Sequence, residues 1–110
     1  MQGVQRISEE DNFRRKGLMK ILVRAFAGFR DVMGERSSYD LPENSDLSTL
    51  LSIIASRSEE SRILLFDDQG RLRGHIILMV NRKRVPRSAI GEMSLSDGDE
   101  VALYPPVAGG

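Results

Sequence analysis

One amphipathic helix restricts the possible folds of this chain more than any other feature. Apolar residues recur at the helical spacing i, i+3, i+4 and i+7, at Leu47, Leu50, Leu51 and Ile54. Ser45 is the expected N-cap, followed by Asp46 at the positive end of the helix dipole, and the helix is expected to reach about Ser58. A helix with one apolar stripe has to bury that stripe against another element.

The other apolar segments predict strands that could form such an element. Residues 20–26 carry hydrophobic groups on both faces, which favours a strand inside a sheet. Weaker or shorter strands are expected at residues 35–41, 75–81, 83–85 and 100–104. A short helical turn is expected at 28–34 and irregular structure at 86–93, whereas residues 63–66 fit either a helix or a strand. This order predicts an α+β fold of the β-grasp type, with a mixed sheet of four to five strands packed on one main helix.

The composition limits the organisation and the partners. A length of 110 residues fits one domain, expected at residues 19–104 between a polar extension (1–18) and a C-terminal tail (105–110). Lys plus Arg equals Asp plus Glu at 16 each, so no net charge attracts nucleic acid or an anionic membrane. No apolar run reaches the ~20 residues that a membrane span needs, and no signal-peptide core is present. A cytoplasmic protein is expected.

The inventory of reactive groups argues against an independent catalyst. The chain has no cysteine and a single histidine, His75, and it lacks the glycine-rich phosphate-binding motifs. Asp97 and Asp99 are interpreted as turn residues, because no third metal ligand lies near them in the sequence. No metal site and no bound cofactor are expected. The sequence therefore favours a carrier, an adaptor or a binding module.

The chain ends in a tail of small residues that follows the last expected strand. Pro105 and Pro106 stop the strand, since neither has an N–H for the sheet ladder, and they restrict the base of the tail. The remaining tail residues are Val107, Ala108, Gly109 and Gly110. Two terminal glycines would let an extended tail pass through a channel too narrow for side chains. The alternative is an ordinary frayed terminus.

Alternation along the strands indicates a possible docking surface. It places Ile21, Val23 and Ala25 on one face of the first strand, and Phe26 on the other face with Tyr104 of the last strand. If the helix covers the aliphatic face, Phe26 and Tyr104 lie on the open face, where they could bind a partner. The alternative is the ordinary scatter of exposed aromatic residues.

Several segments resemble the small, sulfur-carrier subunit of molybdopterin synthase, a member of the ubiquitin-like β-grasp family of sulfur carriers. The C-terminal stretch 97–110 carries most of the resemblance. Ala25-Phe26-Ala27, the run from Arg30 to Gly34, and Val80-Asn81 are also similar. The resemblance covers residues 19–110; the basic run 82–84 departs from the pattern.

The resemblance implies that the chemistry takes place at Gly110. Its carboxylate is a poor electrophile, because it is ionised at neutral pH with a reference pKa of about 3.3–3.7. The resemblance implies that an ATP-using adenylyltransferase of the ubiquitin-activating type adenylates it, and that a sulfur donor converts it to a thiocarboxylate. The tail would then enter the large subunit of molybdopterin synthase, which delivers the sulfur to a cyclic pterin precursor. The chain itself would be a non-catalytic subunit.

Three alternatives remain open on the sequence. A ubiquitin-like modifier would use the same activated Gly110 to acylate lysines of other proteins. A sulfur carrier of the thiamine pathway also ends in Gly-Gly. A non-covalent interaction domain would tolerate the loss of Gly109 and Gly110.

Overall fold

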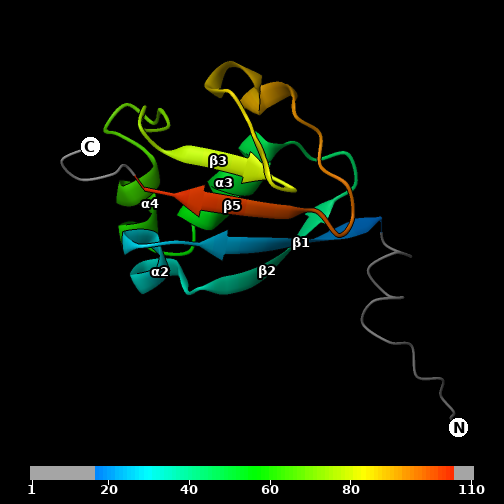
Figure 1. Ribbon diagram of the computed structural model, residues 1–110, viewed down its shortest axis with the longest axis horizontal. Helices are drawn as coiled ribbons and strands as arrows, with labels where there is room; N and C mark the ends of the chain where they lie inside the picture. The colour runs from blue at the N-terminus through cyan, green and yellow to red at the C-terminus, as the bar shows by residue number, and fades with distance from the viewer. Residues whose placement is uncertain (1–16, 106–110) are drawn as a thin grey trace, which may run out of the picture.

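The computed structural model describes residues 17–105, which form one mixed sheet with helices packed against it. The order of strands across the sheet is β2-β1-β5-β3-β4 (Figure 1). The strands are β1 (Leu18–Ala25), β2 (Arg36–Pro42), β3 (Ile77–Val80), β4 (Lys83–Arg84) and β5 (Glu100–Tyr104). The first strand therefore begins at Leu18, slightly before the expected residue 20.

The two central strands come from opposite ends of the described chain. β1 pairs with β5 in parallel, with Val23 opposite Val101 and Ala25 opposite Leu103. β2 is antiparallel to β1, and β3 is antiparallel to both β5 and β4. The arrowheads in Figure 1 show β1 and β5 pointing the same way and β3 pointing the opposite way. This arrangement is the β-grasp, and it confirms the predicted α+β fold.

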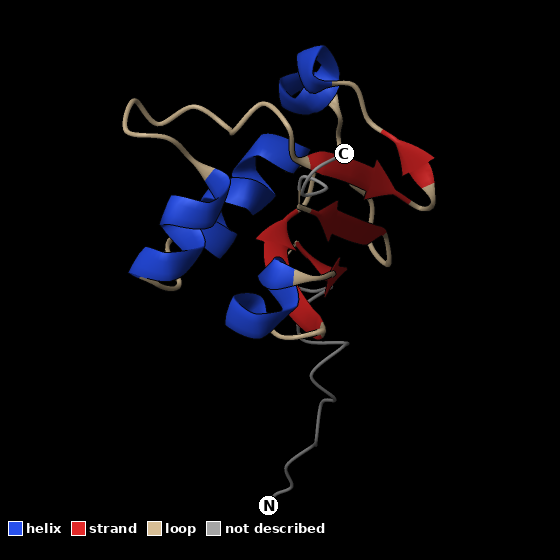
Figure 2. Ribbon diagram, turned by 60° about the vertical axis from the view of Figure 1, so that its left-hand side comes forward, coloured by secondary structure: helices blue, strands red, loops and turns tan. Residues whose placement is uncertain are grey.

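The helices are α2 (Gly28–Met33), α3 (Leu47–Ala55) and α4 (Glu59–Leu65), with a 3-10 helix at Arg87–Glu92. Both α3 and α4 lie on one side of the sheet (Figure 2). Leu47, Leu50, Leu51 and Ile54 are all buried, as the helical spacing predicts. They pack against the alternating buried residues of the strands, Ile21, Val23, Ala25, Leu78, Val101 and Leu103.

The cap of α3 corrects the sequence prediction. Asp46, rather than Ser45, is the N-cap, and its Oδ1 accepts the backbone N–H of Thr49 at 2.8 Å. The Ser45 hydroxyl instead donates to the carbonyl oxygen of Pro42 at 2.6 Å and closes the preceding turn. Both residue types are good caps; the turn at residues 42–45 uses Ser45 and leaves the cap to Asp46.

The main helix is also shorter than expected, because it ends at Ala55 rather than near Ser58. Ser58 has an extended backbone and caps α4, since its Oγ accepts the N–H of Ser61 at 3.0 Å. A residue that caps the next helix cannot continue the previous one. Residues 63–65, which fit either structure on sequence, form the last turn of α4.

Asn81 joins two turns at one end of the sheet. It has a positive φ of 51° in the turn between β3 and β4, a conformation that asparagine tolerates better than most residues. Its side-chain amide donates to Asp99 Oδ1 at 2.9 Å, and its Oδ1 accepts the N–H of Glu100 at 2.9 Å. The start of β5 is thus fixed to the end of β3.

Within residues 17–105, no helix is long and apolar enough to span a membrane.

Candidate functional site

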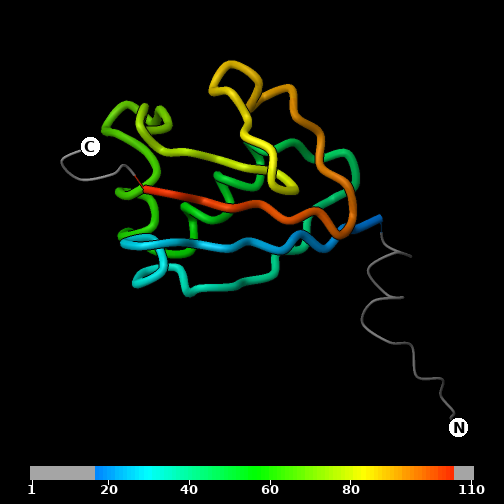
Figure 3. Tube along the Cα trace, viewed as in Figure 1, coloured from blue at the N-terminus to red at the C-terminus, as the bar shows by residue number. Residues whose placement is uncertain are grey.

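The last described residue, Pro105, follows the end of a central strand. The backbone N–H of Phe26 donates to the carbonyl oxygen of Leu103 at 3.1 Å, which continues the β1–β5 pairing to the end of β5. β5 ends on the same side of the molecule as α2 and α4 (Figure 3). The other expected tail residues, Pro106, Val107, Ala108, Gly109 and Gly110, lie outside the described residues. The base of the tail is therefore anchored in the middle of the sheet.

Phe26 and Tyr104 lie together on the face of the sheet opposite α3. Their rings are stacked, with centroids 4.4 Å apart and an angle of 2° between the ring planes. Both residues are half-buried, whereas their strand neighbours Ala25 and Leu103 point into the core. The predicted alternation of the two strands is confirmed, and the aromatic pair flanks the base of the tail on the open face.

Arg24 adds a positive charge to this aromatic pair. Its guanidinium carbon lies 5.2 Å from the centroid of the Phe26 ring, within the range of a cation–π contact. Its Nη1 is 3.6 Å from Glu100 Oε2, a partly exposed ion pair. Its Nε is buried and has no hydrogen-bond partner among the described residues. An unpaired buried donor costs free energy, and because the Nε is buried, only the partly exposed remainder of the guanidinium is within reach of an incoming acceptor.

These residues border a pocket of about 290 Å³ on the open face. The pocket is lined by Arg24, Phe26, Met79, Arg82, Glu100, Ala102 and Tyr104. Met79 is half-buried on β3, between the buried Leu78 and Val80. Arg24 and Met79 were not expected as site residues from the sequence, although the strand alternation that located Phe26 also places both on the open face. Aromatic, thioether and arginine side chains are typical of the centre of a protein interface.

The basic run 82–84 lies at the edge of the sheet, where all three side chains are exposed. Arg82 is in the β3–β4 turn, with a φ of 71°, and contributes to the rim of the open-face pocket.

The acidic turn before β5 has a structural role. The Asp99 Oδ2 accepts the N–H of Ser96 at 2.8 Å, and the Asp97 Oδ1 accepts the N–H of Lys20 at 2.8 Å. In the part of the chain that the structure describes, no group of three or more His, Cys, Asp or Glu residues could hold a metal ion. The Asp97 carboxylate thus joins this turn to β1, and the Asp99 carboxylate closes the turn itself and binds Asn81.

Comparison with protein-family models identifies a family for most of the chain. The model described as the ThiS family matches residues 23–110. The match includes β1 from Val23, every later element of the sheet and the C-terminal Gly109-Gly110.

Individual relatives agree with this family. Small archaeal modifier protein 3 of Haloferax volcanii is 30% identical over 93 residues, which cover 84% of this chain and all of that protein. The crystal structure of SAMP1 from Haloferax volcanii has a TM-score of 0.73 at 26% identity, covering 83% of this chain and 99% of that one. A complex of subunits 1 and 2 of molybdopterin-converting factor from Helicobacter pylori includes a chain with a TM-score of 0.53 at 26% identity, covering 84% of this chain and 100% of that one.

Proposed function

This chain belongs to the ThiS family of ubiquitin-fold sulfur carriers and modifiers, and we propose that it carries sulfur for the synthesis of molybdopterin. In this proposal the chain is the non-catalytic small subunit of a molybdopterin synthase. Gly110 carries the sulfur as a C-terminal thiocarboxylate. The adenylating enzyme uses ATP, and this chain binds no cofactor of its own.

The observation that carries the proposal is the C-terminal stretch 97–110, which resembles the end of the sulfur-carrier subunit of molybdopterin synthase. The family match extends to Gly110, and a relative is found in a complex of two molybdopterin-converting-factor subunits. The anchoring of β5 between β1 and β3 supports the same function. A tail that leaves a rigid central strand can be inserted into a partner without disturbing the core.

The chemistry proceeds in two steps at the carboxylate of Gly110. An oxygen of the carboxylate attacks the α-phosphorus of ATP, pyrophosphate leaves, and an acyl adenylate forms. The outer sulfur of a persulfide on the donor then attacks the acyl carbon and displaces AMP, which forms an acyl disulfide with the donor. A thiol attacks the donor's own sulfur in this disulfide, the thiocarboxylate leaves, and the donor and the thiol are left joined as a disulfide. Adenylation is needed because a free carboxylate is a poor electrophile at neutral pH.

The open sheet face has the second role, as the surface that docks on the large subunit. The stacked Phe26–Tyr104 pair supplies apolar area, and Arg24 supplies a partly exposed guanidinium. Aromatic and arginine residues contribute a large share of the binding free energy in many interfaces. This surface borders Pro105, so a partner that receives the tail would also contact it.

A single-turnover sulfur transfer tests the proposal. The thiocarboxylated chain is mixed with the large subunit and the cyclic pterin precursor, and its mass is followed with time. We expect the chain to lose the mass difference between sulfur and oxygen while a sulfur-containing pterin forms. Retention of the sulfur in the complete mixture would contradict the proposal. The control is the chain in the carboxylate form, which should give no product.

A second function is favoured by the 30% identity to small archaeal modifier protein 3. As a protein modifier, the chain would transfer its activated Gly110 to lysine side chains. The same reaction mixture, supplemented with ATP, the adenylating enzyme and a cell extract, distinguishes the two functions. Lysine conjugates of this chain would support the modifier, and a sulfur-containing pterin would support the carrier.

A further inference from the structure

A second surface lies on the other side of the tail base, between α2 and α4. It is a groove of about 410 Å³, distinct from the pocket on the open sheet face. Gly28 and Phe29 come from the start of α2, Ile63 and Leu64 from the end of α4, and Pro105 from the base of the tail. Arg73, His75 and Ile76 complete the groove from the segment before β3.

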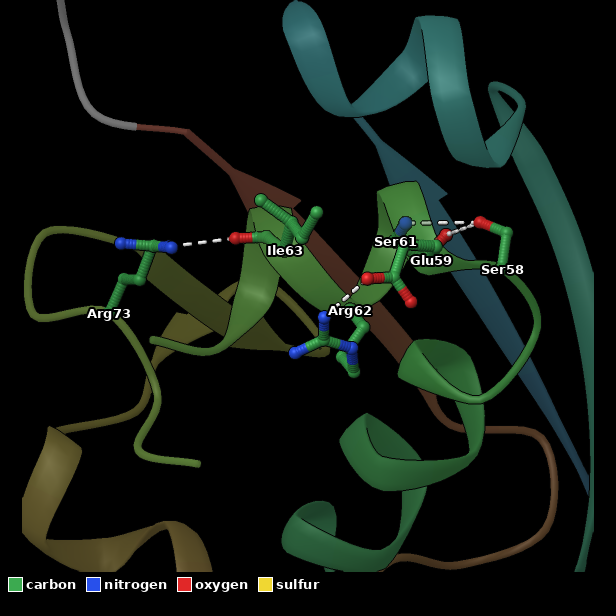
Figure 4. A network of polar contacts seen from close by, with 6 residues as sticks. All are labelled: Ser58, Glu59, Ser61, Arg62, Ile63 and Arg73. Atoms are coloured by element: carbon green, nitrogen blue, oxygen red, sulfur yellow. Dashed lines mark hydrogen bonds and ion pairs between the residues drawn. The ribbon is translucent and has the colours of Figure 1, made fainter. Parts of the chain in front are cut away.

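Ile63 makes this groove unusual. Its side chain is 47% exposed, the highest exposure of a large hydrophobic residue within 17–105. The floor beside it is apolar, since Phe29 is 1% exposed and Ile76 is 9% exposed. Figure 4 shows the Ile63 side chain pointing away from Glu59 and Arg62, which form an ion pair elsewhere on α4. An exposed apolar side chain above an apolar groove is typical of a binding surface.

The groove is held in place by hydrogen bonds that tie α4 to the segment before β3. The Nε of Arg73 donates to the carbonyl oxygen of Ile63 at 2.8 Å (Figure 4). The backbone N–H of Arg73 donates to the carbonyl oxygen of Leu65 at 2.9 Å. Arg87 then donates from Nη1 to the carbonyl oxygen of Arg73 at 3.0 Å. A preformed surface loses less conformational entropy on binding than a surface that must be ordered first.

We propose that this groove seats an apolar side chain of the enzyme that adenylates Gly110, flanked by a carboxylate of the same enzyme. This inference rests on the proposed chemistry at Gly110, but applies equally to a carrier and a modifier. Pro105 lines the groove and begins the tail, so the groove lies directly beside the path by which the tail enters the active site of such an enzyme. The adenylating enzyme then contacts the tail base from the helix side, whereas the large subunit contacts it from the open sheet face.

The charged side chains of the groove indicate which kind of group the partner enzyme places beside it. Among the described residues, the ionisable side chains that line it are those of Arg73 and His75, and none of these lining residues carries a carboxylate. A carboxylate on the partner would therefore complete an ion pair at the rim. His75 is exposed, which makes it accessible to the partner and leaves the core unaffected by its substitution.

The test is the ATP–pyrophosphate exchange reaction with the cognate adenylating enzyme. Ile63→Asp and His75→Glu should each raise the KM for this chain, by about tenfold or more for Ile63→Asp. The kcat should be unchanged, because the two substitutions alter the docking surface and leave the reacting group, the carboxylate of Gly110, chemically the same. Ile63→Leu keeps the apolar contact and should behave like the wild type. Ser88→Asp is the matched control, since it adds the same charge at an exposed position outside the groove.

The outcomes separate the groove from the proposed function. If the wild type is active and Ile63→Asp, His75→Glu and Ser88→Asp have equal KM values, the groove is not a docking site for the adenylating enzyme. The proposed function would not be affected by this result. No exchange with the wild type would instead overturn the function. A lower KM for Ile63→Asp would show that the groove binds the chain's own tail. A wild-type dimer that Ile63→Asp converts to a monomer would show that it binds a second copy. Either of the last two results would overturn the inference.

Discussion

The rings of Phe26 and Tyr104 lie parallel across the two central strands, with centroids 4.4 Å apart. One residue directly follows β1 and the other ends β5, so the pair forms only when the two parallel strands are in register. Such a pair contributes about 0.5–1.5 kcal/mol beyond the area that it buries. Because the pair lies on the open face, correct pairing of the two strands also forms the surface next to the tail base.

Replacement of both aromatic residues by aspartate separates docking from folding. Phe26→Asp with Tyr104→Asp should leave a folded monomer, because the core lies on the other face of the sheet. Association with the large subunit should weaken by about 2 kcal/mol or more, since interface aromatics are lost and carboxylates are desolvated. The thermal midpoint and a calorimetric titration measure the two effects. Phe26→Leu with Tyr104→Phe is the control that keeps an apolar surface, and an unchanged affinity in the aspartate variant would place the docking surface elsewhere.

The apolar face of α3 is the main contact between the helices and the sheet. Leu50 and Ile54 are 0% and 1% exposed, so replacement of either by alanine should cost about 2–5 kcal/mol of unfolding free energy. Ser52, on the exposed face of the same helix, is the control, and Ser52→Ala should change stability by less than about 0.5 kcal/mol. Urea unfolding measures all three. Equal unfolding free energies for the three alanine variants would mean that Leu50 and Ile54 do not lie in the core.

The assignment of the N-cap predicts different costs at two neighbouring positions. Asp46→Ala removes the acceptor for the Thr49 N–H and should cost about 0.5–2 kcal/mol. Ser45→Ala removes only the exposed hydrogen bond to Pro42 and should cost less. Chemical denaturation of the two variants gives the comparison. A larger loss at Ser45 would show that Ser45 is the cap in solution.

Asp67 gives a pH dependence with a defined sign. The backbone N–H groups of Arg71 and Gln69 donate to its Oδ1 and hold the pKa of the carboxyl below its ordinary value of 3.8. A lowered pKa in the folded state stabilises the protein above the ordinary value, and this stabilisation is lost as the pH falls through the folded pKa. Wild type should therefore be more stable than Asp67→Ala at neutral pH, and the difference should shrink in acid. A difference independent of pH, in unfolding curves across this range, would contradict the role of the carboxylate.

Strand alternation and helical spacing were sufficient to predict most of the fold. They placed Leu50 and Ile54 in the core and Phe26 and Tyr104 on the opposite face, because each pattern is local and repeats. The choice between Ser45 and Asp46 as cap depended on the conformation of the turn before them, which the residue types alone do not determine.

The groove at Ile63 could not be predicted in the same way. Its lining comes from four separate segments, represented by Phe29, Ile63, His75 and Pro105, and no local pattern connects them. Arg24 is an intermediate case. Its place on the open face follows from strand alternation. Whether its Nε finds a hydrogen-bond partner among the described residues depends on how the neighbouring side chains pack.

Gly110 is proposed to carry sulfur, and the mass of the C-terminal peptide shows whether it does. The chain should be purified from its native cell and cleaved after Glu100, because the resulting peptide 101–110 contains no methionine. Methionine oxidation adds nearly the same mass as the exchange of oxygen for sulfur, so this choice of peptide removes the main source of confusion. We predict a fraction of the peptide heavier by the difference between sulfur and oxygen, with the added mass at Gly110. A peptide found entirely as the free carboxylate or joined to lysines of other proteins, with no thiocarboxylate, would contradict the account.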